Sequence, residues 1–439
     1  MALGRVAAAT AQKKEEKVQK IAPPTASFQD LGVDGWLCDT LKAMQIKRPS
    51  EIQRACIPPA LAGKDIIGGA KTGSGKTAAF ALPILQKLSE DPYGVFALVL
   101  TPTRELAFQI AEQFRVLGKG IGLKDCIVVG GMDMTDQAVA LAKRPHIIIA
   151  TPGRLHDHIL HSIGAVHLSR CKFLVMDEAD MLLTPSFAPQ LADILPLLPE
   201  KRQTLLFTAT MTDSILAIRD AKEDPKKKPF VHLCDMSVST VATLDQYYLF
   251  VPSHVRTVYL AHILRSEEFK DKSVMIFCGK CKNAQLTANI LRQLGVRCTE
   301  LHSHMSQQER LASIGKFRTE IVKVLISTDV GSRGLDIPAV QAVINYHIPR
   351  DPTDYIHRVG RTARAGRGGM ALSIISERDI QLIQNIEERI NKKLEEYRVD
   401  ENKILNELSE VTTAKRKASM FMHDTEIKQE QRRVKKSKQ

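Results

Sequence analysis

Short apolar runs alternate with helical patterns along most of the 439-residue chain. Between residues 28 and 235, runs rich in Val, Ile or Leu are bounded by polar or turn residues and are too short for typical helices. These runs are residues 65–68, 95–100, 126–129, 146–150, 172–176 and 204–207. Stretches with apolar residues at helical spacing, such as 104–117, lie between them. The alternation predicts parallel strands joined by right-handed helical crossovers, and therefore a doubly wound α/β domain over residues 28–235.

The alternation restarts in the second half of the chain. A charged, proline-bearing stretch at 221–229 and the polar residues after it predict a linker at 236–245. The elements expected after it are strands at 247–251, 274–278, 324–327, 341–345 and 371–375 and helices at 283–294 and 307–317. They predict a second α/β domain over residues 246–395, on which one apolar helix face packs. That face consists of Ile383, Ile386, Ile390 and Leu394.

The two ends of the chain lack this alternation. Residues 1–27 are rich in Ala and Lys and are expected to be a flexible arm. Residues 396–439 are expected to be helical at first and then a basic, disordered tail. From residue 414 on, nine basic residues face three acidic ones, and we expect this part to be solvated. Two basic clusters, at 415–417 and 432–436, are candidates for a nuclear address or for an additional grip on RNA, unless they are only a solvated end.

Composition narrows the class of protein. Hydrophobic residues make up 44% and charged residues 25% of the chain, which excludes a wholly disordered or fibrous protein. The net charge of +13 favours a polyanionic partner, either nucleic acid or an anionic membrane surface, and a soluble protein that merely has basic tails is an equally weighted alternative at this point. No apolar run approaches the length of a membrane-spanning helix, and the start of the chain lacks the core of a secretory signal.

The eight cysteines are scattered through the sequence, as in proteins of reducing compartments. Cys278 and Cys281 form a CxxC pair, but no second pair stands at zinc spacing. We therefore attribute this pair to chance rather than to a metal or redox site.

A glycine-rich loop follows the first predicted strand. Residues 70–77 read Ala-Lys-Thr-Gly-Ser-Gly-Lys-Thr, and a helical pattern begins at residue 78. Strand, glycine loop and helix start are the context of a phosphate-binding loop, because glycines let backbone N–H groups turn toward phosphates and the helix N-terminus attracts them. Lys76 can reach the β- and γ-phosphates, and the Thr77 hydroxyl can bind Mg²⁺. Ala70 stands where the pattern has Gly, and a small residue fits there.

An acidic string follows a second predicted strand. Asp177, Glu178, Ala179 and Asp180 come directly after the run at 172–176. A carboxylate at the carboxyl end of a strand beside a phosphate-binding loop is where such ATPases hold the metal, so Asp177 is the expected Mg²⁺ ligand. Glu178 can orient or deprotonate the attacking water. The alternative is that the string is only the solvated acidic start of a helix. It is disfavoured because the string comes about 100 residues after a well-matched phosphate-binding loop.

Together with further motifs, these residues resemble one family, the DEAD-box ATP-dependent RNA helicases, over residues 28–395. The motifs are RPSEIQ at 48–53, AKTGSGKT at 70–77, PTRELA at 102–107, TPGR at 151–154, DEAD at 177–180, TAT at 208–210, STDVGSRGLD at 327–336 and HRVGRTARAGR at 357–367. The resemblance implies two tandem RecA-like domains. Stretches such as LPILQKLSEDPYG also resemble one branch, the DEAD-box helicase forty-nine type, which implies nucleolar work on the small ribosomal subunit.

For the ATP site, the resemblance implies roles for residues of both domains. Gln53 would read the adenine edge, and Phe28 would stack on the base unless it is a core anchor. Residues 70–77 would bind the phosphates: Ala70, Lys71, Thr72, Gly73, Ser74, Gly75, Lys76 and Thr77. From the second domain, Asp336 would contact the ribose, and Arg361 and Arg364 would be arginine fingers that share a face if helical. His357 would join the network near the attacking water, unless it is a buried structural histidine.

For RNA, the resemblance implies backbone contacts from both domains. Those of the first domain are Pro102, Thr103, Arg104, Gly131, Thr151, Pro152, Gly153 and Arg154. Those of the second domain are Gln307, Arg310, Thr328 and Asp329. An ion pair is the plain alternative for Arg104 taken alone. Contacts of this kind carry little sequence preference.

The chain departs from the family pattern at three places. Thr208 of the Thr208-Ala209-Thr210 string stands where Ser is usual, and its hydroxyl is expected to bond Asp180 and to keep the two domains coupled. Gly331 replaces the usual Ala, which should be mild. Gly279 and Lys280 stand where Asn-Thr is frequent, which leaves that RNA-facing detail open.

The expected function is RNA-stimulated ATP hydrolysis coupled to local unwinding of RNA or remodelling of ribonucleoprotein. The expected cofactors are ATP and Mg²⁺, and the expected partners are single-stranded RNA and ribosome-assembly proteins. We expect a nuclear, nucleolar monomer that does not bind membranes. Two other classes stay open: an ATP-gated RNA clamp, and a phosphate-loop enzyme acting on a small molecule, against which the arginine-bearing second domain argues.

Overall fold

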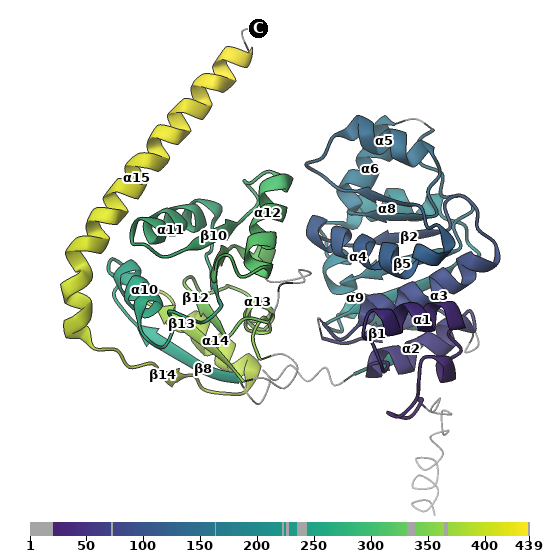
Figure 1. Cartoon of the computed structure of the whole chain (residues 1–439), viewed down its shortest axis with the longest axis horizontal. Helices are drawn as coiled ribbons and strands as arrows, with labels where there is room; N and C mark the ends of the chain where they lie inside the picture. Colours follow the sequence, from purple (N-terminus) through teal and green to yellow (C-terminus); the bar gives the residue numbers. More distant parts are fainter. Residues whose placement is uncertain are drawn as a thin grey trace, which may run out of the picture.

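The computed structural model describes residues 21–437, except residues 72, 163, 222–223, 225–227, 235–243, 332–336, 338 and 364–367. The described residues form two α/β domains, each built on a seven-stranded sheet whose paired strands are all parallel (Figure 1). The expected fold class, two tandem doubly wound domains, is confirmed. Among these residues, no helix combines the length and the apolar character needed to cross a membrane.

The first sheet has the order β3-β4-β2-β5-β6-β1-β7. Its strands are β1 (Ile66–Gly69), β2 (Ala97–Leu100), β3 (Asp125–Val128), β4 (Ile147–Ala150), β5 (Phe173–Asp177), β6 (Gln203–Thr208) and β7 (Phe230–Leu233). The central strands are fully buried, as their apolar runs predict. The short edge strand β7 was not predicted, because its residues are only half-buried and follow a charged stretch.

Helices cover both faces of this sheet. They are α1 (Gly35–Ala43), α2 (Glu51–Leu61), α3 (Lys76–Glu90), α4 (Arg104–Leu117), α5 (Met134–Ala142), α6 (Pro152–His161), α7 (Ala179–Leu182), α8 (Ala188–Ile194) and α9 (Asp213–Asp220). Phe80, Phe114 and Phe207 belong to the core on one face, and Leu155 and Ile215 to the core on the other.

The expected N-terminal arm, residues 1–27, differs from the structure at its end. Residues 1–20 lie outside the described part, but Ala26 is buried in the first domain and Ala22 packs against the same core. The guanidinium of Arg54 also donates to the Ala22 carbonyl at 3.2 Å. The first domain therefore extends over residues that composition alone assigns to the arm.

The second sheet has the order β10-β11-β9-β12-β13-β8-β14. Its strands are β8 (Leu244–Phe250), β9 (Val274–Phe277), β10 (Cys298–Leu301), β11 (Val324–Ser327), β12 (Ala342–Asn345), β13 (Gly369–Ile375) and β14 (Glu395–Glu396). Its helices are α10 (Arg256–Arg265), α11 (Cys281–Gln293), α12 (Gln307–Arg318), α13 (Pro352–Val359) and α14 (Ile380–Ile390). Strand β8 begins inside the expected linker at 236–245, most of which lies outside the described residues. The apolar face at residues 383, 386 and 390 packs on this domain, as expected, and Leu394 joins the same core beyond the helix end.

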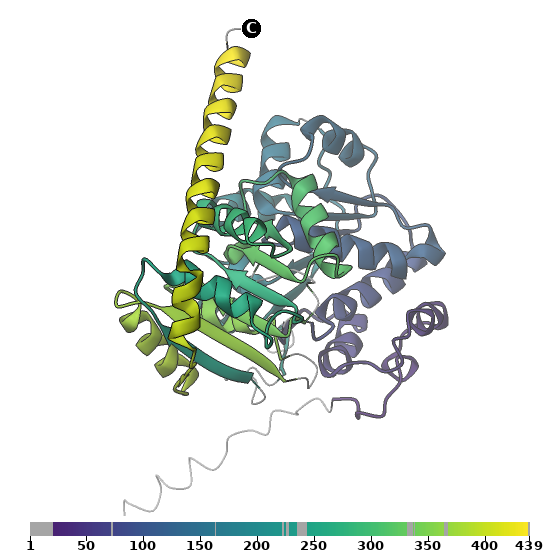
Figure 2. The ribbon, with the colours of Figure 1, turned by 60° about the vertical axis from the view of Figure 1, so that its left-hand side comes forward.

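The last segment differs from the expected disordered tail. Helix α15 runs from Glu401 to Ser437 and packs along α10 and α11 before it leaves the domain (Figures 1 and 2). Ile404, Val411, Ala414 and Ala418 are buried in the second domain's core. These four residues share one helical face, and counting apolar residues over the whole tail hides that periodicity. His262 reaches Glu407 at 2.7 Å and Arg265 reaches Glu410 at 2.8 Å, which adds polar contacts along the same seam.

Candidate nucleotide and RNA site

The phosphate-binding loop lies between the end of β1 and the start of α3. Lys76, the first residue of α3, is buried and donates from its Nζ to the Ala70 carbonyl at 2.7 Å. Gly73 and Gly75 have φ angles of 82° and 88°, a left-handed conformation that glycine adopts without strain. A side chain at Gly75 would also collide with the Gln53 amide. The loop thus needs glycine both for its turn and for the close approach of α2; Thr72 lies outside the described residues.

Gln53 ties helix α2 to this loop. Its Oε1 accepts from the Ser50 backbone N–H at 2.9 Å, and its Nε2 donates to the Gly75 carbonyl at 3.0 Å. The amide that is expected to read adenine therefore already orders the loop beside the base site. Phe28 is only 5% exposed and belongs to the first domain's core, so the geometry supports the core-anchor alternative for it.

The acidic string begins at the carboxyl end of β5, where Asp177 and Glu178 are both buried. Glu178 has φ 53°, so the chain turns sharply into α7. Burial and, to a lesser extent, the neighbouring charge of Asp177 raise the pKa of Glu178, Lys76 and Arg361 lower it, and the net result is a pKa of about 7. Its Oε2 has no hydrogen-bond partner among the described residues. A buried carboxylate with a raised pKa and one oxygen free of hydrogen bonds to the described residues suits a general base.

The expected metal ligands fit a hard cation. Burial raises the pKa of Asp177, against the opposing charge of Lys76. The Thr77 hydroxyl stands in the first turn of α3, next to Lys76. Carboxylate and hydroxyl oxygens are the donors that Mg²⁺ prefers, and a divalent cation would compensate the desolvated charge of Asp177.

The expectation that the Thr208 hydroxyl bonds Asp180 is wrong. Thr210, not Thr208, donates to Asp180, with 2.6 Å between Oγ1 and Oδ2. The Thr208 hydroxyl donates instead to the Thr210 carbonyl at 2.7 Å and accepts from the Thr210 N–H at 3.2 Å. Thr208 ends β6 with its side chain buried, so it shapes the turn that presents Thr210 to Asp180.

The second domain contributes Arg361 to the same site. Arg361 is 1% exposed, and its charge lowers the pKa of Glu178 in the first domain. It follows the end of α13 at Val359, so Arg361 does not lie on a helix. His357 lies on α13 itself. Arg364 and Asp336 lie outside the described residues, and their roles stay predictions.

The RNA-contact candidates of the first domain gather at one end of its sheet. Residues 102–104, Gly131 and residues 151–154 follow β2, β3 and β4, which are neighbours in the sheet. Thr103 caps α4, and Thr151 precedes α6 with a proline in its first turn. Gly131, with φ 80°, packs so closely on the Arg104 guanidinium that a Cβ would collide with it. Arg154 donates to the Met132 carbonyl at 3.2 Å, so the loop is preformed beside two helix N-termini, where phosphates bind.

The candidates of the second domain are placed differently from expectation. Gln307 and Arg310, in the first turn of α12, are buried against Glu105 of the first domain. They are therefore contacts between domains in this structure, not exposed RNA contacts. Asp329 accepts from the Arg358 Nε at 2.6 Å, and Thr328 is buried with its N–H on the Leu301 carbonyl at 3.3 Å.

Sequence reasoning assigned no role to Glu105 or Arg358. Glu105 is 1% exposed in the first turn of α4, and Arg358 is 1% exposed on α13. Besides Asp329, Arg358 donates to the His347 carbonyl at 2.7 Å. Both residues lie inside motifs of the family resemblance, PTRELA at 102–107 and HRVGRTARAGR at 357–367, but a motif does not identify the partner of each side chain.

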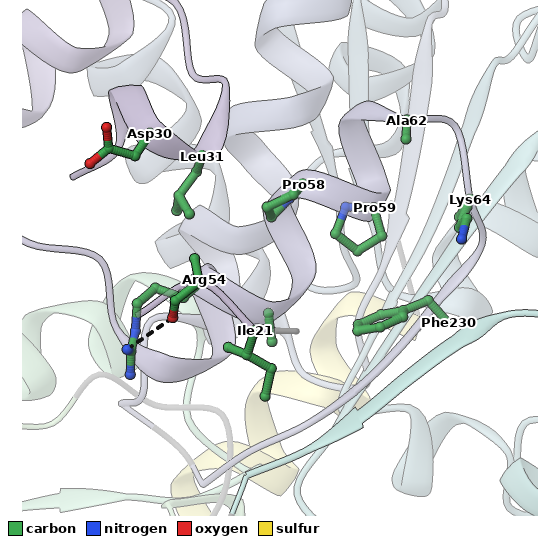
Figure 3. A pocket seen from close by; sticks show the side chains of 11 residues that line it. Ile21, Asp30, Leu31, Arg54, Pro58, Pro59, Ala62, Lys64 and Phe230 are labelled. Atoms are coloured by element: carbon green, nitrogen blue, oxygen red, sulfur yellow. Dashed lines mark hydrogen bonds between the residues drawn. The ribbon is translucent and has the colours of Figure 1, made fainter. Parts of the chain in front are cut away.

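A cavity of about 380 Å³ lies on the other side of α2 (Figure 3). It is lined by Arg54, Pro58 and Pro59 of α2, by Phe230 of β7, and by Ile21. None of the predicted site residues takes part. The cavity is therefore distinct from the nucleotide site, although both abut the same helix.

Comparison with known proteins agrees with this arrangement. The DEAD/DEAH box helicase model matches residues 50–218, and the helicase conserved C-terminal domain matches residues 256–366. The chain is 56% identical over 409 residues to the ATP-dependent RNA helicase dbp8 of Schizosaccharomyces pombe, covering 91% of this chain and 89% of that protein. It is 50% identical to the probable ATP-dependent RNA helicase DDX49 of Homo sapiens, covering 94% and 86%.

Solved structures resemble both domains together. Dbp5 of S. cerevisiae bound to RNA and ADP BeF3 has a TM-score of 0.74 and 29% identity, over 89% of this chain and 99% of that one. Mss116p bound to single-stranded RNA and AMP-PNP has a TM-score of 0.76 and 28% identity, over 88% and 82%.

Proposed function

This chain belongs to the DEAD-box family of ATP-dependent RNA helicases, which hydrolyse ATP, and on that premise we propose how it works and where. RNA binding across both domains stimulates hydrolysis, and the cycle opens short RNA duplexes or remodels ribonucleoprotein. The setting is the processing of ribosomal RNA precursors and the assembly of the small ribosomal subunit. The relation between Glu178 and Arg361, which come from different domains, is the observation that supports the mechanism.

ATP binds at the start of α3. Backbone N–H groups of residues 70–77, the helix N-terminus and Lys76 bind the phosphates, and the Gln53 amide reads the base. Thr77 and Asp177 would hold Mg²⁺, which would supply positive charge beside the phosphates. Asp177 and Glu178 are adjacent on one sharp turn, so the base is positioned by the same backbone as the metal ligand.

Hydrolysis requires both domains. Glu178 accepts the proton of the attacking water, and its pKa of about 7 leaves much of it ionised at neutral pH. Arg361 stabilises the charge that develops on the transferred phosphoryl group, a contribution worth about 10³–10⁵ in rate. Because Arg361 belongs to the second domain, the rate depends on how tightly the domains meet. RNA that bridges them favours the closed state and so stimulates the reaction.

RNA lies on the helix starts and loops at the carboxyl ends of β2, β3 and β4 and on the second domain opposite. The solved structures of Dbp5 and Mss116p that this chain resembles hold RNA, which supports RNA binding by this chain. Closure bends the bound strand, and each stacked step lost costs about 1.4 kcal/mol, so only short duplexes open in one event.

The biochemical test combines two assays on the full chain. RNA-stimulated ATP hydrolysis and displacement of a strand from a short RNA duplex are measured for the wild type, Glu178→Gln and Arg361→Ala. We expect both variants to bind ATP and to lose both activities, while a DNA oligomer stimulates little. Retention of RNA with a non-hydrolysable ATP analogue, without displacement when ATP is present, would instead identify an ATP-gated clamp.

The proposed cellular setting rests on the branch of the family that the sequence resembles. The proposal puts the protein in the nucleolus as a monomer that works with ribosome-assembly proteins. Crosslinking in cells, followed by sequencing of the bound RNA, should recover precursor ribosomal RNA around small-subunit sequences. Recovery of mainly messenger RNA would overturn this setting without affecting the helicase mechanism.

The basic clusters at 415–417 and 432–436 are proposed as the nuclear address. Both lie on α15, which is helical to Ser437. Replacing the basic residues of 432–436 with Gln spares the buried part of the helix. Entry of this variant and of a chain ending at residue 413 into the nucleus would show that the address lies elsewhere.

A further inference from the structure

Three side chains with metal-binding atoms meet outside the nucleotide site. Glu51, His232 and Cys234 place a carboxylate oxygen, an imidazole nitrogen and a thiol sulfur within 4.8 Å of one another. The His232 Nε2 lies 3.3 Å from the Glu51 Oε1. Neither the proposed ATP chemistry nor the proposed RNA contacts use this group of three.

The fold brings the three residues together from two elements. Phe230, His232 and Cys234 alternate along β7 and past its end, so their side chains share one face of this edge strand. Phe230 points toward Pro59 near the end of α2 (Figure 3). His232 and Cys234 then reach the start of the same helix, where Glu51 stands in the first turn.

Both elements are anchored independently of the three side chains. The Cys234 N–H donates to the Gly69 carbonyl at 2.8 Å, which extends the pairing of β7 with β1. The Ser50 backbone N–H donates to the Gln53 Oε1 at 2.9 Å, which fixes the first turn of α2. The backbone is therefore in place before any ligand arrives, which lowers the cost of binding.

We propose that Glu51, His232 and Cys234 form a binding site for Zn²⁺ on the edge of the first domain. Thiolate, imidazole and carboxylate together suit Zn²⁺, which accepts sulfur, nitrogen and oxygen ligands. Mg²⁺ and Ca²⁺ prefer oxygen alone, so this donor set discriminates against the cation of the ATP site. Three protein ligands leave the fourth tetrahedral position for water.

Small side-chain movements suffice to close the site. Zinc bonds of about 2.0 Å to nitrogen or oxygen and about 2.3 Å to sulfur put neighbouring ligand atoms roughly 3.3–3.6 Å apart. The Glu51 and His232 atoms already have such a separation. The Glu51 side chain is 53% exposed and can rotate toward the other two, and the ion enters from solvent on that side.

Zinc binding is coupled to ionisation of the Cys234 thiol. Burial and the nearby Glu51 carboxylate raise the pKa of the Cys234 thiol to about 12, so the thiol stays protonated beside an acidic group. When the Zn–S bond forms, the thiol proton leaves to solvent and the cation balances both negative ligands. Binding should therefore release a proton and strengthen as the pH rises.

The site adjoins the nucleotide pocket without overlapping it. Glu51 stands two residues before Gln53 on α2, and the charge of Lys76 is felt by the Cys234 thiol. The expected Mg²⁺ ligands Thr77 and Asp177 include no sulfur. A probe that reports a metal–sulfur bond therefore distinguishes the two cation sites.

The test titrates the full-length protein with Co²⁺ in the presence of excess Mg²⁺, and follows the absorption of thiolate-to-cobalt charge transfer. We expect one equivalent of the band, its loss on adding one equivalent of Zn²⁺, and its absence in Cys234→Ser. The matched control is Cys281→Ser, because Cys281 is the other cysteine that is not buried. That variant should keep the band.

A second variant and a second measurement keep the test independent of the folding of one mutant. His232→Ala should weaken Co²⁺ binding by more than about tenfold, since one of three ligands is lost. Zn²⁺ should raise the unfolding temperature of the wild type and of Cys281→Ser but not of Cys234→Ser, while the metal-free variants unfold like the wild type. Absence of the band in the wild type, or its persistence in Cys234→Ser, would overturn the proposal.

Discussion

Arg310 of the second domain lies 2.8 Å from Glu105 of the first, measured from Nη2 to Oε2, and both side chains are buried. Gln307, one turn earlier on α12, donates to the other oxygen of Glu105 at 3.1 Å. One carboxylate of the first domain is thus bound by two side chains of the second. When the domains separate, all three groups become hydrated again. The contact therefore stabilises the closed arrangement only if the ion pair and the hydrogen bond together compensate for the lost hydration.

Removing one partner should therefore weaken closure. In Arg310→Met, Glu105 stays buried in the closed state without its cation, which costs about 3–5 kcal/mol for a buried pair. We expect energy transfer between dyes on the two domains, with RNA and a non-hydrolysable ATP analogue bound, to show a closed population more than tenfold smaller. Arg292→Met, which loses a pair with Glu300 inside the second domain, is the control. Wild-type closure in Arg310→Met would refute the role of this pair.

The rate of hydrolysis should depend on the ionisation of Glu178. Burial raises its pKa to about 7, so the carboxyl is largely protonated at pH 6 and cannot accept a proton from water. The kcat at saturating ATP and RNA should rise between pH 6 and pH 8, with a midpoint near 7. Glu178→Gln should abolish hydrolysis at every pH while a fluorescent nucleotide still binds. A flat pH profile in the wild type would remove Glu178 from the role of base.

The two threonines of the Thr208-Ala209-Thr210 string should differ in their effect. Thr210→Val removes the donor to Asp180, a buried acid, and should lower the free energy of unfolding by about 1–3 kcal/mol. Thr208→Ser keeps the hydroxyl that bonds the Thr210 backbone and should change stability little. Urea unfolding of both variants gives the comparison. Equal losses would mean that the methyl group of Thr208 matters as much as the bond to Asp180.

The sequence alone predicts that Gly331 in place of the usual Ala is a mild change, but the packing around it predicts that Gly331→Ala is destabilising. A Cβ there would collide with the Ser327 hydroxyl and come within 2.7 Å of the Met275 methyl carbon. Because Ser327 donates to the Leu301 and Thr328 carbonyls, it cannot move without losing a bond. Gly331→Ala should cost about 1–3 kcal/mol of stability, as overpacking does.

The matched control for that substitution is Gly279→Ala. Its Cβ would meet the Cβ of His347 at 3.5 Å, an ordinary contact. Thermal unfolding should show a clear drop for Gly331→Ala and almost none for Gly279→Ala. If the two variants unfold alike, the local packing around Ser327 is looser than described.

Helix α15 should contribute to the stability of the second domain. Ala418 is fully buried against this domain, and Ala418→Asp would place a charge there without a partner. We expect the unfolding midpoint of the second domain to fall by several degrees. Met420→Asp, at a position that is 65% exposed, should have little effect. Similar losses in both variants would indicate that charge on the helix, not burial, is responsible.

Much of this architecture could be predicted from the sequence because its signals are local. Buried parallel strands such as β4 and β5 are continuous apolar runs, and the phosphate loop and the acidic string are short and follow such runs directly. The edge strands were not predicted, because β7 is only half-buried and β14 consists of only two exposed residues. The helical start of the last segment was predicted, but the length of α15 and its packing were not, because four buried residues on one face are diluted by a polar majority.

The partners of the site residues were harder to predict than their positions. Spacing places Gln307 and Arg310 on one face of a helix, but not opposite an acid some 200 residues away in the sequence. The choice between Thr208 and Thr210 as the donor to Asp180 depends on the turn after β6, which sequence alone does not specify. Contacts between domains depend on how the two folded domains are oriented relative to each other, and a local sequence pattern does not specify this orientation.

The long final helix also sets a distance. At about 1.5 Å per residue, the part of α15 from residue 419 to its end at Ser437 spans about 28 Å, and Figures 1 and 2 both show it extending away from the domain. A flexible tail of the same composition would sweep a sphere around its attachment point. A helix whose first half is buried in the domain instead forms a rigid projection. The residues that anchor it are Ile404, Val411, Ala414 and Ala418. A partner bound near residue 437 would therefore stay at a fixed distance and in a fixed direction from the second domain. It would move together with this domain when the two domains open and close.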